Sequence, residues 1–212
     1  MGEEQDGSGP LSPRAAAQAA TVVGQMERMR PAAFEHARRV ASFAVRLARF
    51  AHLPEALVEQ IYWGALVHDV GELNVPSALL HSDVAIDESD RIAICRHTIV
   101  GARWLAGVPD LAALAPFARW HHERFDGLGY PDGATAREVP LTVAVVAVSD
   151  AWDALTGPRP HRAALDVDAA AAEMQRHSGR QWSRTLVEWT IATAEQFDGT
   201  PDDDSDAGFE AR

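Results

Sequence analysis

Ala65-Leu66-Val67-His68-Asp69-Val70-Gly71-Glu72 is the stretch around which the rest of the chain is organised. An apolar run ends in an adjacent histidine and aspartate, and a nearby glycine lets the backbone turn. His68 offers a neutral imidazole nitrogen, and Asp69 offers two oxygens, enough to contact two cations at once. A single His-Asp pair carries little information, so its meaning depends on residues elsewhere in the chain.

The segment that leads into this pair predicts a helix. One row of apolar side chains at helical spacing ends in His68, and the neighbouring row ends in Asp69. Both polar side chains are therefore expected to leave the last turn of the helix close to its buried face.

Proline and glycine divide the rest of the chain into further helices. Ser12 is expected to cap an Ala-rich helix from Pro13 to about Met29. The apolar run 140–155 is too long for a typical strand and favours a helix. Residues 77–87 are expected to be a loop with at most one helical turn, and residues 124–133 a shaped loop. The remaining predicted helices start at Pro31, Pro54, Glu88 and Pro109 or span 166–177 and 183–197.

The composition suits one helical domain between two polar tails. The chain has 212 residues, of which 47% are hydrophobic, enough for a substantial core. We expect a single domain over residues 13–197, a disordered tail over 1–12 and an acidic disordered tail over 198–212.

The net charge of −12 comes mainly from the two ends of the chain. This distribution argues against duplex nucleic acid or an anionic membrane as the main partner. One cysteine, Cys95, excludes a disulfide framework within the chain. Neither a signal peptide nor a membrane-spanning run is recognised, so the expected location is the cytoplasm.

Further metal-type side chains stand beside apolar sequence that predicts helix. Imidazoles and carboxylates that converge from separate helices suit a borderline first-row metal, and two such metals can clamp a phosphoester. The alternative is that these histidines are ordinary core residues. An adjacent histidine pair directly before a Gly-rich loop argues against that alternative. The residues are His36, His97, His121, His122 and Asp150.

The order of these residues resembles an HD-GYP domain, a branch of the HD metal-dependent phosphohydrolase superfamily. The resemblance covers roughly residues 30–190 and implies an all-α fold, an HD-domain helical bundle with a metal site in its core. Family members bind two or three metals, and many hydrolyse cyclic di-GMP to pGpG or GMP. The motifs are His36, His68-Asp69, His97 with Gly101, His121-His122-Glu123, Asp126-Gly127-Leu128-Gly129-Tyr130-Pro131, Asp150 through Asp153-Ala154-Leu155-Thr156, and Arg159-Pro160-His161-Arg162.

The resemblance implies a role for each matched position. Two divalent transition metals, iron or manganese, would activate a hydroxide, with Asp69 as the bridge and Asp69 and Glu72 in the catalytic set. The loop Gly129-Tyr130-Pro131 would border the substrate, and Arg159 would meet its phosphate. The implied metal ligands are His36, His68, Asp69 and Asp150 for one ion and Asp69, His97, His121 and His122 for the other.

Three positions depart from the family pattern. Glu72 stands where a lysine usually meets substrate phosphate, and Ala32 stands where members with a third metal carry a glutamate. Two metals rather than three are therefore expected. The third departure, residues 179–184, is expected to affect only local packing.

Three functions follow as hypotheses. The first is a cyclic di-GMP phosphodiesterase. The second is a catalytically weak signalling or scaffold module that binds a cyclic dinucleotide or a GGDEF-type partner. The third is an HD phosphohydrolase that acts on another nucleotide. The intact ligand set favours an enzyme, and Glu72 favours weak activity; the oligomeric state stays open.

Overall fold

The computed structural model describes residues 9–80, 87–158 and 163–197. Within these ranges every regular element is a helix, apart from one isolated bridge between Ser178 and Trp182. The all-α fold class is thereby confirmed. Arg159, residues 1–8 of the predicted N-terminal tail and the whole predicted tail 198–212 lie outside the described residues, so the predicted domain boundaries stay predictions.

Prolines mark where the first long helices begin. Helix α1 spans Pro13–Met29, with Pro13 in its first turn and the Ser12 hydroxyl accepting a hydrogen bond from the Ala15 amide at 3.1 Å. Helix α2 spans Pro31–Phe50, and α3 spans Glu55–Val67 directly after Pro54. A proline fits the first turn of a helix because its missing N–H would have no partner there. These predicted starts are confirmed.

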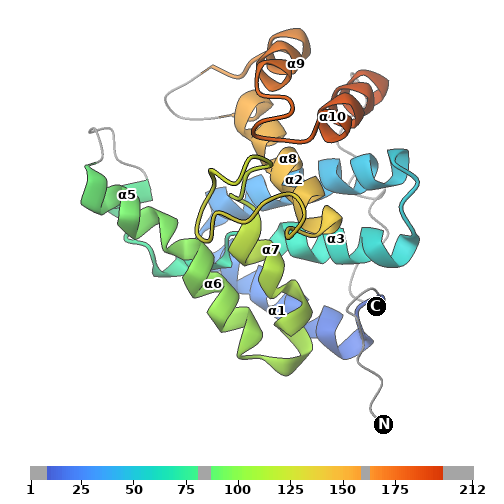
Figure 1. Cartoon of the computed structure of the whole chain (residues 1–212). Coiled ribbons are helices and arrows are strands. Elements are labelled where there is room, and N and C mark those ends of the chain that lie inside the picture. Colours follow the sequence, from blue (N-terminus) through green and yellow to red (C-terminus); the bar gives the residue numbers. More distant parts are fainter. Residues whose placement is uncertain (1–8, 81–86, 159–162, 198–212) are drawn as a thin grey trace.

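The remaining elements carry the chain around the first three helices (Figure 1). The apolar run after Pro140 is a helix, as its length predicts. The elements are η1 (Val70–Asn74), α4 (Ser77–Leu80), α5 (Glu88–Cys95), α6 (His97–Ala106), η2 (Pro109–Leu114), α7 (Ala115–Trp120), α8 (Leu141–Thr156), α9 (Val167–Arg176) and α10 (Arg184–Phe197).

The core forms where α2 packs against α3 and α8. Leu47 of α2, Ile61 of α3 and Val145 of α8 are fully buried. Burial of each such side chain contributes about 1.5–3 kcal/mol. Because His68 and Asp69 directly follow α3, this packing holds them beside α2 and α8. No helix in the described ranges has both the length and the apolar character needed to cross a bilayer.

Two predicted helices are interrupted in the structure. The helix expected to run through His97 from Glu88 breaks at Arg96. The side chains of His97 and Thr98 hydrogen-bond to the carbonyls of Ile94 and Cys95, at 2.8 Å and 2.9 Å. Those carbonyls would otherwise accept from amides of a continuous helix. His97 therefore begins α6 rather than lying in mid-helix.

The second interruption lies after Pro109. A 3₁₀ turn runs to Leu114, and α7 then begins at Ala115. Pro116 has no N–H to donate and its ring clashes with the carbonyl four residues earlier, so one α-helix cannot run through it. The prediction of a single helix from Pro109 was wrong, although its end beside His121 is found as expected.

Candidate metal centre

A close backbone approach brings the His-Asp turn against the start of α6. A Cβ atom placed on Gly71 would overlap the carbonyl oxygen of His97 and lie 2.8 Å from the Gly101 amide nitrogen. Only glycine fits at position 71 without a backbone shift. The contact places His97 beside Asp69, although the two residues come from different elements.

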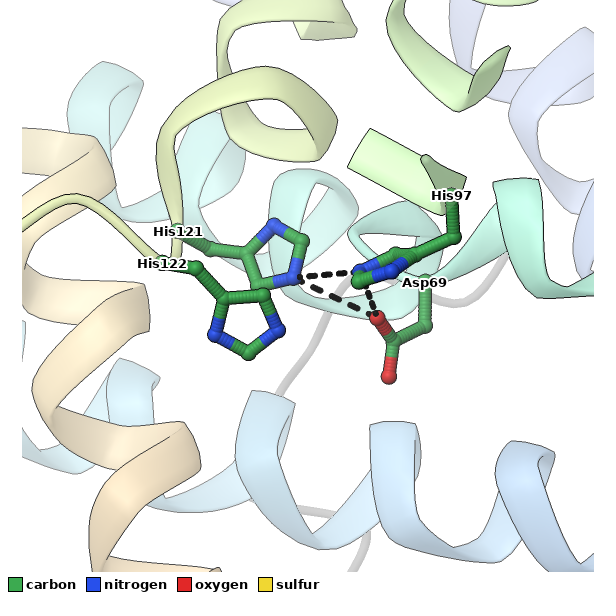
Figure 2. A group of neighbouring side chains, drawn as sticks. All are labelled: Asp69, His97, His121 and His122. Carbon is green, nitrogen blue, oxygen red and sulfur yellow. Dashed lines mark hydrogen bonds and ion pairs between the residues drawn. The ribbon is translucent and has the colours of Figure 1, made fainter. Parts of the chain in front are cut away.

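Three imidazole nitrogens surround the Asp69 carboxylate. The Nε2 atoms of His97 and His121 lie 3.2 Å and 3.3 Å from Oδ1, and His68 Nε2 lies 3.3 Å from Oδ2. Figure 2 shows His97 and His121 directed at the carboxylate, with the ring of His122 beside them. His68, His97 and His121 are buried. The cluster is thus a polar site inside an apolar core.

Backbone carbonyls fix the orientation of these three rings. A carbonyl only accepts, so each Nδ1 carries the proton and each Nε2 presents a lone pair to the centre in the neutral ring. His68 Nδ1 donates to the Ala65 carbonyl at 2.6 Å. His97 Nδ1 donates to the Ile94 carbonyl at 2.8 Å, and His121 Nδ1 donates to the Phe117 carbonyl at 2.9 Å.

The donor set fits metal ions. His97 Nε2 and His121 Nε2 lie 3.2 Å apart, and two lone pairs at that distance repel unless a cation or a proton lies between them. His68 Nε2 and Asp69 Oδ1 are buried and make no hydrogen bond. Buried polar atoms without partners are costly, and metal coordination would satisfy both.

Ligand-type atoms gather in two overlapping groups among the described residues. Within each group they all lie within 4.8 Å of one another. Asp69 belongs to both groups, as a bridging carboxylate would. Asp150 lies beside the second group, with Oδ1 3.1 Å from His36 Nε2. The groups are Asp69, His97, His121 and His122 for the first and His36, His68 and Asp69 for the second.

Histidine pKa values differ between the two groups of ligand-type atoms. Burial and the neighbouring His121 lower the pKa of His122 to about 3. Burial would lower the pKa of His36, but hydrogen bonds to nearby carboxylates raise it to about 10. Burial also opposes the charged form of His68, yet the charge of Asp69 raises its pKa to about 9. Without metal, the second group therefore holds protons that a bound cation would replace.

Glu72 lies on η1 near the centre but in neither ligand group. Burial and the charge of Asp69 raise the pKa of its carboxyl to about 7. Its backbone carbonyl accepts a hydrogen bond from Arg30 at 3.2 Å. Glu72 thus lies in the electrostatic field of the cluster but in neither group of ligand-type atoms.

The predicted loop lies directly against the histidine pair. The Tyr130 ring centroid is 4.8 Å from that of His122, and the Tyr130 amide donates to the His122 carbonyl at 3.3 Å. A Cβ on Gly129 would lie 2.5 Å from the Arg124 amide nitrogen, so position 129 also requires glycine. The Tyr130–Pro131 bond is cis. The structure brings Gly129, Tyr130 and Pro131 to the cluster, whereas Arg159 lies outside the described residues.

Contacts outside the Gly129-Tyr130-Pro131 segment also hold the loop. Glu123 is buried, and its Oε1 accepts from the Asp132 amide at 2.7 Å. The amides of Phe125 and Asp126 donate to the carbonyls of Gln181 and Arg180, each at 2.9 Å. Residues 179–184, expected to affect only local packing, therefore support the loop directly.

Asp153 is the residue near the cluster whose role the sequence did not reveal. Its Oδ2 lies 2.7 Å from His36 Nδ1. Asp153 stands three residues after Asp150 on α8, so both carboxylates leave the same face of that helix. This spacing was the available signal in the sequence.

Comparison with known proteins identifies the family of the chain. The family model described as HD domain matches residues 22–186. A cyclic di-GMP phosphodiesterase of Thermotoga maritima is 33% identical over 155 residues, which are 72% of this chain and 42% of that protein. The 3'3'-cGAMP-specific phosphodiesterase 3 of Vibrio cholerae is 34% identical over 142 residues, 67% of this chain and 31% of that protein. The chain thus spans less than half the length of these two relatives.

Two solved structures share the fold at low sequence identity. Bd1817, an HDG"Y"P protein from Bdellovibrio bacteriovorus, superposes with a TM-score of 0.65 at 17% identity, covering 85% of this chain and 61% of that one. The PgpH HD domain of L. monocytogenes in complex with cyclic-di-AMP gives a TM-score of 0.63 at 15% identity, covering 85% and 98%. The predicted helical bundle is therefore also the fold of known HD domains.

Proposed function

The chain belongs to the HD domain family, and from this premise we propose that it is a metal-dependent phosphodiesterase of cyclic dinucleotides. Cyclic di-GMP is the proposed substrate, with pGpG or GMP as the product. The observation that carries the proposal is the position of Asp69, shared by two groups of ligand-type atoms. Relatives named as cyclic di-GMP and 3'3'-cGAMP phosphodiesterases support the substrate class.

The family is metal-dependent, and we propose two divalent transition ions, iron or manganese. Mixed imidazole and carboxylate donors suit such borderline metals. One ion would be held by His97, His121 and His122 and the other by His36, His68 and Asp150, with Asp69 shared. When bound, a metal pair of this kind lowers the pKa of a water and stabilises charge on phosphoryl oxygens.

The chain's own residues orient the reaction. The Nδ1 hydrogen bonds of His68, His97 and His121 keep each Nε2 directed at the centre. The apolar core around the rings excludes water from the far side, which strengthens the electrostatic interactions inside. The Tyr130 ring packs against that of His122 at a tilt and would form one edge of the substrate site. We propose that Arg159 meets a substrate phosphate.

Glu72 favours a second candidate function. Where a lysine would attract the substrate phosphate, Glu72 places a carboxylate in the field of Asp69. Weak turnover would suit a signalling module that binds a cyclic dinucleotide or a GGDEF-type partner. It would equally suit preference for another nucleotide, such as 3'3'-cGAMP, the substrate in the name of the Vibrio cholerae relative described above.

The test is anaerobic purification, metal analysis, and incubation with a panel of cyclic and linear dinucleotides. The proposal expects about two equivalents of metal and conversion of at least one cyclic dinucleotide to a linear product. Metal-loaded protein that binds cyclic dinucleotides but leaves the whole panel intact would support the signalling alternative. Hydrolysis that persists after complete metal removal would overturn both.

A further inference from the structure

His36 is held differently from the other oriented histidines of the cluster. His68, His97 and His121 each donate their Nδ1 proton to a backbone carbonyl. His36 instead places Nδ1 2.7 Å from a carboxylate oxygen, Oδ2 of Asp153. A hydrogen bond to an ionised acceptor is shorter and stronger than one to a neutral carbonyl. His36 is thus bound to a negatively charged partner on the side away from the centre.

Arg39 holds that carboxylate in place. Its Nε donates to Oδ1 of Asp153 at 2.6 Å, and its Nη2 donates to Oδ2 at 3.0 Å. Such a two-point contact fixes both the position and the plane of the carboxylate. Asp153 is buried, and Arg39 stays charged at any ordinary pH, so the aspartate remains an ionised acceptor.

The backbone leaves room for this arrangement. A Cβ on Gly157 would lie 2.9 Å and 3.0 Å from the two carboxylate oxygens of Asp153. Asp150 stands one turn earlier on α8, with Oδ1 3.1 Å from His36 Nε2. The imidazole of His36 therefore lies between two carboxylates of one helix, with Nδ1 bound to Asp153 and Nε2 facing Asp150 and the centre.

We propose that Asp153, clamped by Arg39, is a positioning residue that directs Nε2 of His36 toward the metal shared with His68 and Asp69. A carboxylate on the far nitrogen fixes the tautomer and makes the imidazole a stronger donor. This inference rests on the proposed metal centre and assigns Asp153 to one of its two sites. Loss of such a supporting residue typically weakens metal binding about 10–100-fold.

The first test measures Mn(II) binding by the Asp153→Asn variant. Asparagine keeps the size of the side chain but removes its charge. Metal-free protein is titrated with Mn(II), the electron paramagnetic resonance signal of free Mn(II) is followed, and two bound equivalents are expected in the wild type. We expect the variant to bind one equivalent about 10–100-fold more weakly and the other within about twofold of wild type. Unchanged affinity for both equivalents would overturn the proposal.

Glu55→Gln is the matched control. Glu55 pairs with Arg49, another arginine of α2, at 2.8 Å, but this pair is exposed and distant in sequence from every ligand-type residue. The control removes a carboxylate contact of another α2 arginine, and it should leave the affinities of both Mn(II) equivalents unchanged. If Asp153→Asn fails to fold, Arg39→Gln loosens the clamp while keeping the carboxylate, and it should weaken the same equivalent. If Arg39→Gln then bound both Mn(II) equivalents with wild-type affinity, the proposed role of Arg39 and Asp153 would be refuted.

A second readout separates positioning from general stability. In protein labelled with nitrogen-15 at histidine and loaded with diamagnetic Zn(II), a carboxylate-bound Nδ1 proton resonates further downfield than a carbonyl-bound one. One such signal is expected in the wild type, absent from His36→Asn, and moved upfield in Asp153→Asn. A signal that does not move in Asp153→Asn would count against the role assigned to Asp153.

These measurements distinguish the inference from the proposed function. Two bound metals without hydrolysis of any cyclic dinucleotide would refute the phosphodiesterase, while the Mn(II) and Zn(II) readouts still decide the role of Asp153. Wild-type protein that binds no transition metal would refute both.

Discussion

Gly71→Ala is the most direct test of how the backbone builds the centre. The added Cβ would overlap the carbonyl oxygen of His97 and lie 2.8 Å from the Gly101 amide nitrogen. Both are backbone atoms, so no side-chain rotation relieves the contact. Gly71 is not among the residues with positive φ, so the cost is steric rather than conformational.

The expected magnitude follows from these contacts. An ordinary contact needs about 3.5 Å, and the overlap with the carbonyl oxygen of His97 is the tighter one, so η1 and α6 must separate by roughly 1 Å or more. Overpacking of this kind costs about 1–3 kcal/mol, which lowers the melting temperature by about 2–12 °C for a chain of this size. Because Asp69 and His97 lie on opposite sides of the contact, 3.2 Å apart, the same shift widens the ligand set.

The assay combines thermal unfolding of metal-free protein with Mn(II) titration. Gly107→Ala is the matched control, since the nearest atoms to a Cβ there lie at an ordinary 3.4 Å. Gly71→Ala should lose stability and bind Mn(II) more weakly, whereas Gly107→Ala should resemble the wild type. A Gly71→Ala protein with the melting temperature and Mn(II) affinity of the control would refute the reasoning.

Three further changes test the site itself. Asp69→Ala should abolish binding of both metals in elemental analysis because both groups share it, whereas His97→Ala should mainly empty one site; two equivalents retained by Asp69→Ala would disprove the bridge. A strong chelator should abolish any cyclic dinucleotide hydrolysis, and Mn(II) or Fe(II) should restore it in an activity assay. Glu72→Lys should improve substrate binding by roughly 5- to 150-fold, or about 1–3 kcal/mol, seen as a lower KM with unchanged metal content. An unchanged KM would show that Glu72 does not face the substrate.

Proline positions and helical spacing predicted most of the fold. Pro13, Pro31 and Pro140 mark helix starts that the structure confirms, because a proline tolerates only a few helical positions. The break at Arg96 was not predictable from periodicity, since it depends on His97 and Thr98 side chains that bond to the backbone. The break before α7 was predictable, because Pro116 is visible in the sequence.

The ligand-type residues of the candidate site could be recognised from the sequence, but the contacts that hold them in place could not. The order of the motifs along the chain identifies the ligand-type residues, whether they stand at a helix end, as His68 and His97 do, or inside a helix, as Asp150 does. The bond between His36 and Asp153 joins residues 117 positions apart, and no local pattern predicts such a contact. The close backbone contact that requires glycine at position 71 likewise depends on how α6 packs against η1, which only the three-dimensional arrangement reveals.

The contact between the loop and the turn before α10 has a consequence for how far the domain can be shortened. A chain cut after Gly157 would keep every ligand-type residue of the two groups and Asp150. It would nevertheless leave the amides of Phe125 and Asp126 without the carbonyls of Gln181 and Arg180 that now accept from them. The smallest fragment that retains the loop in its present position therefore extends at least to Gln181, well beyond the last ligand-type side chain.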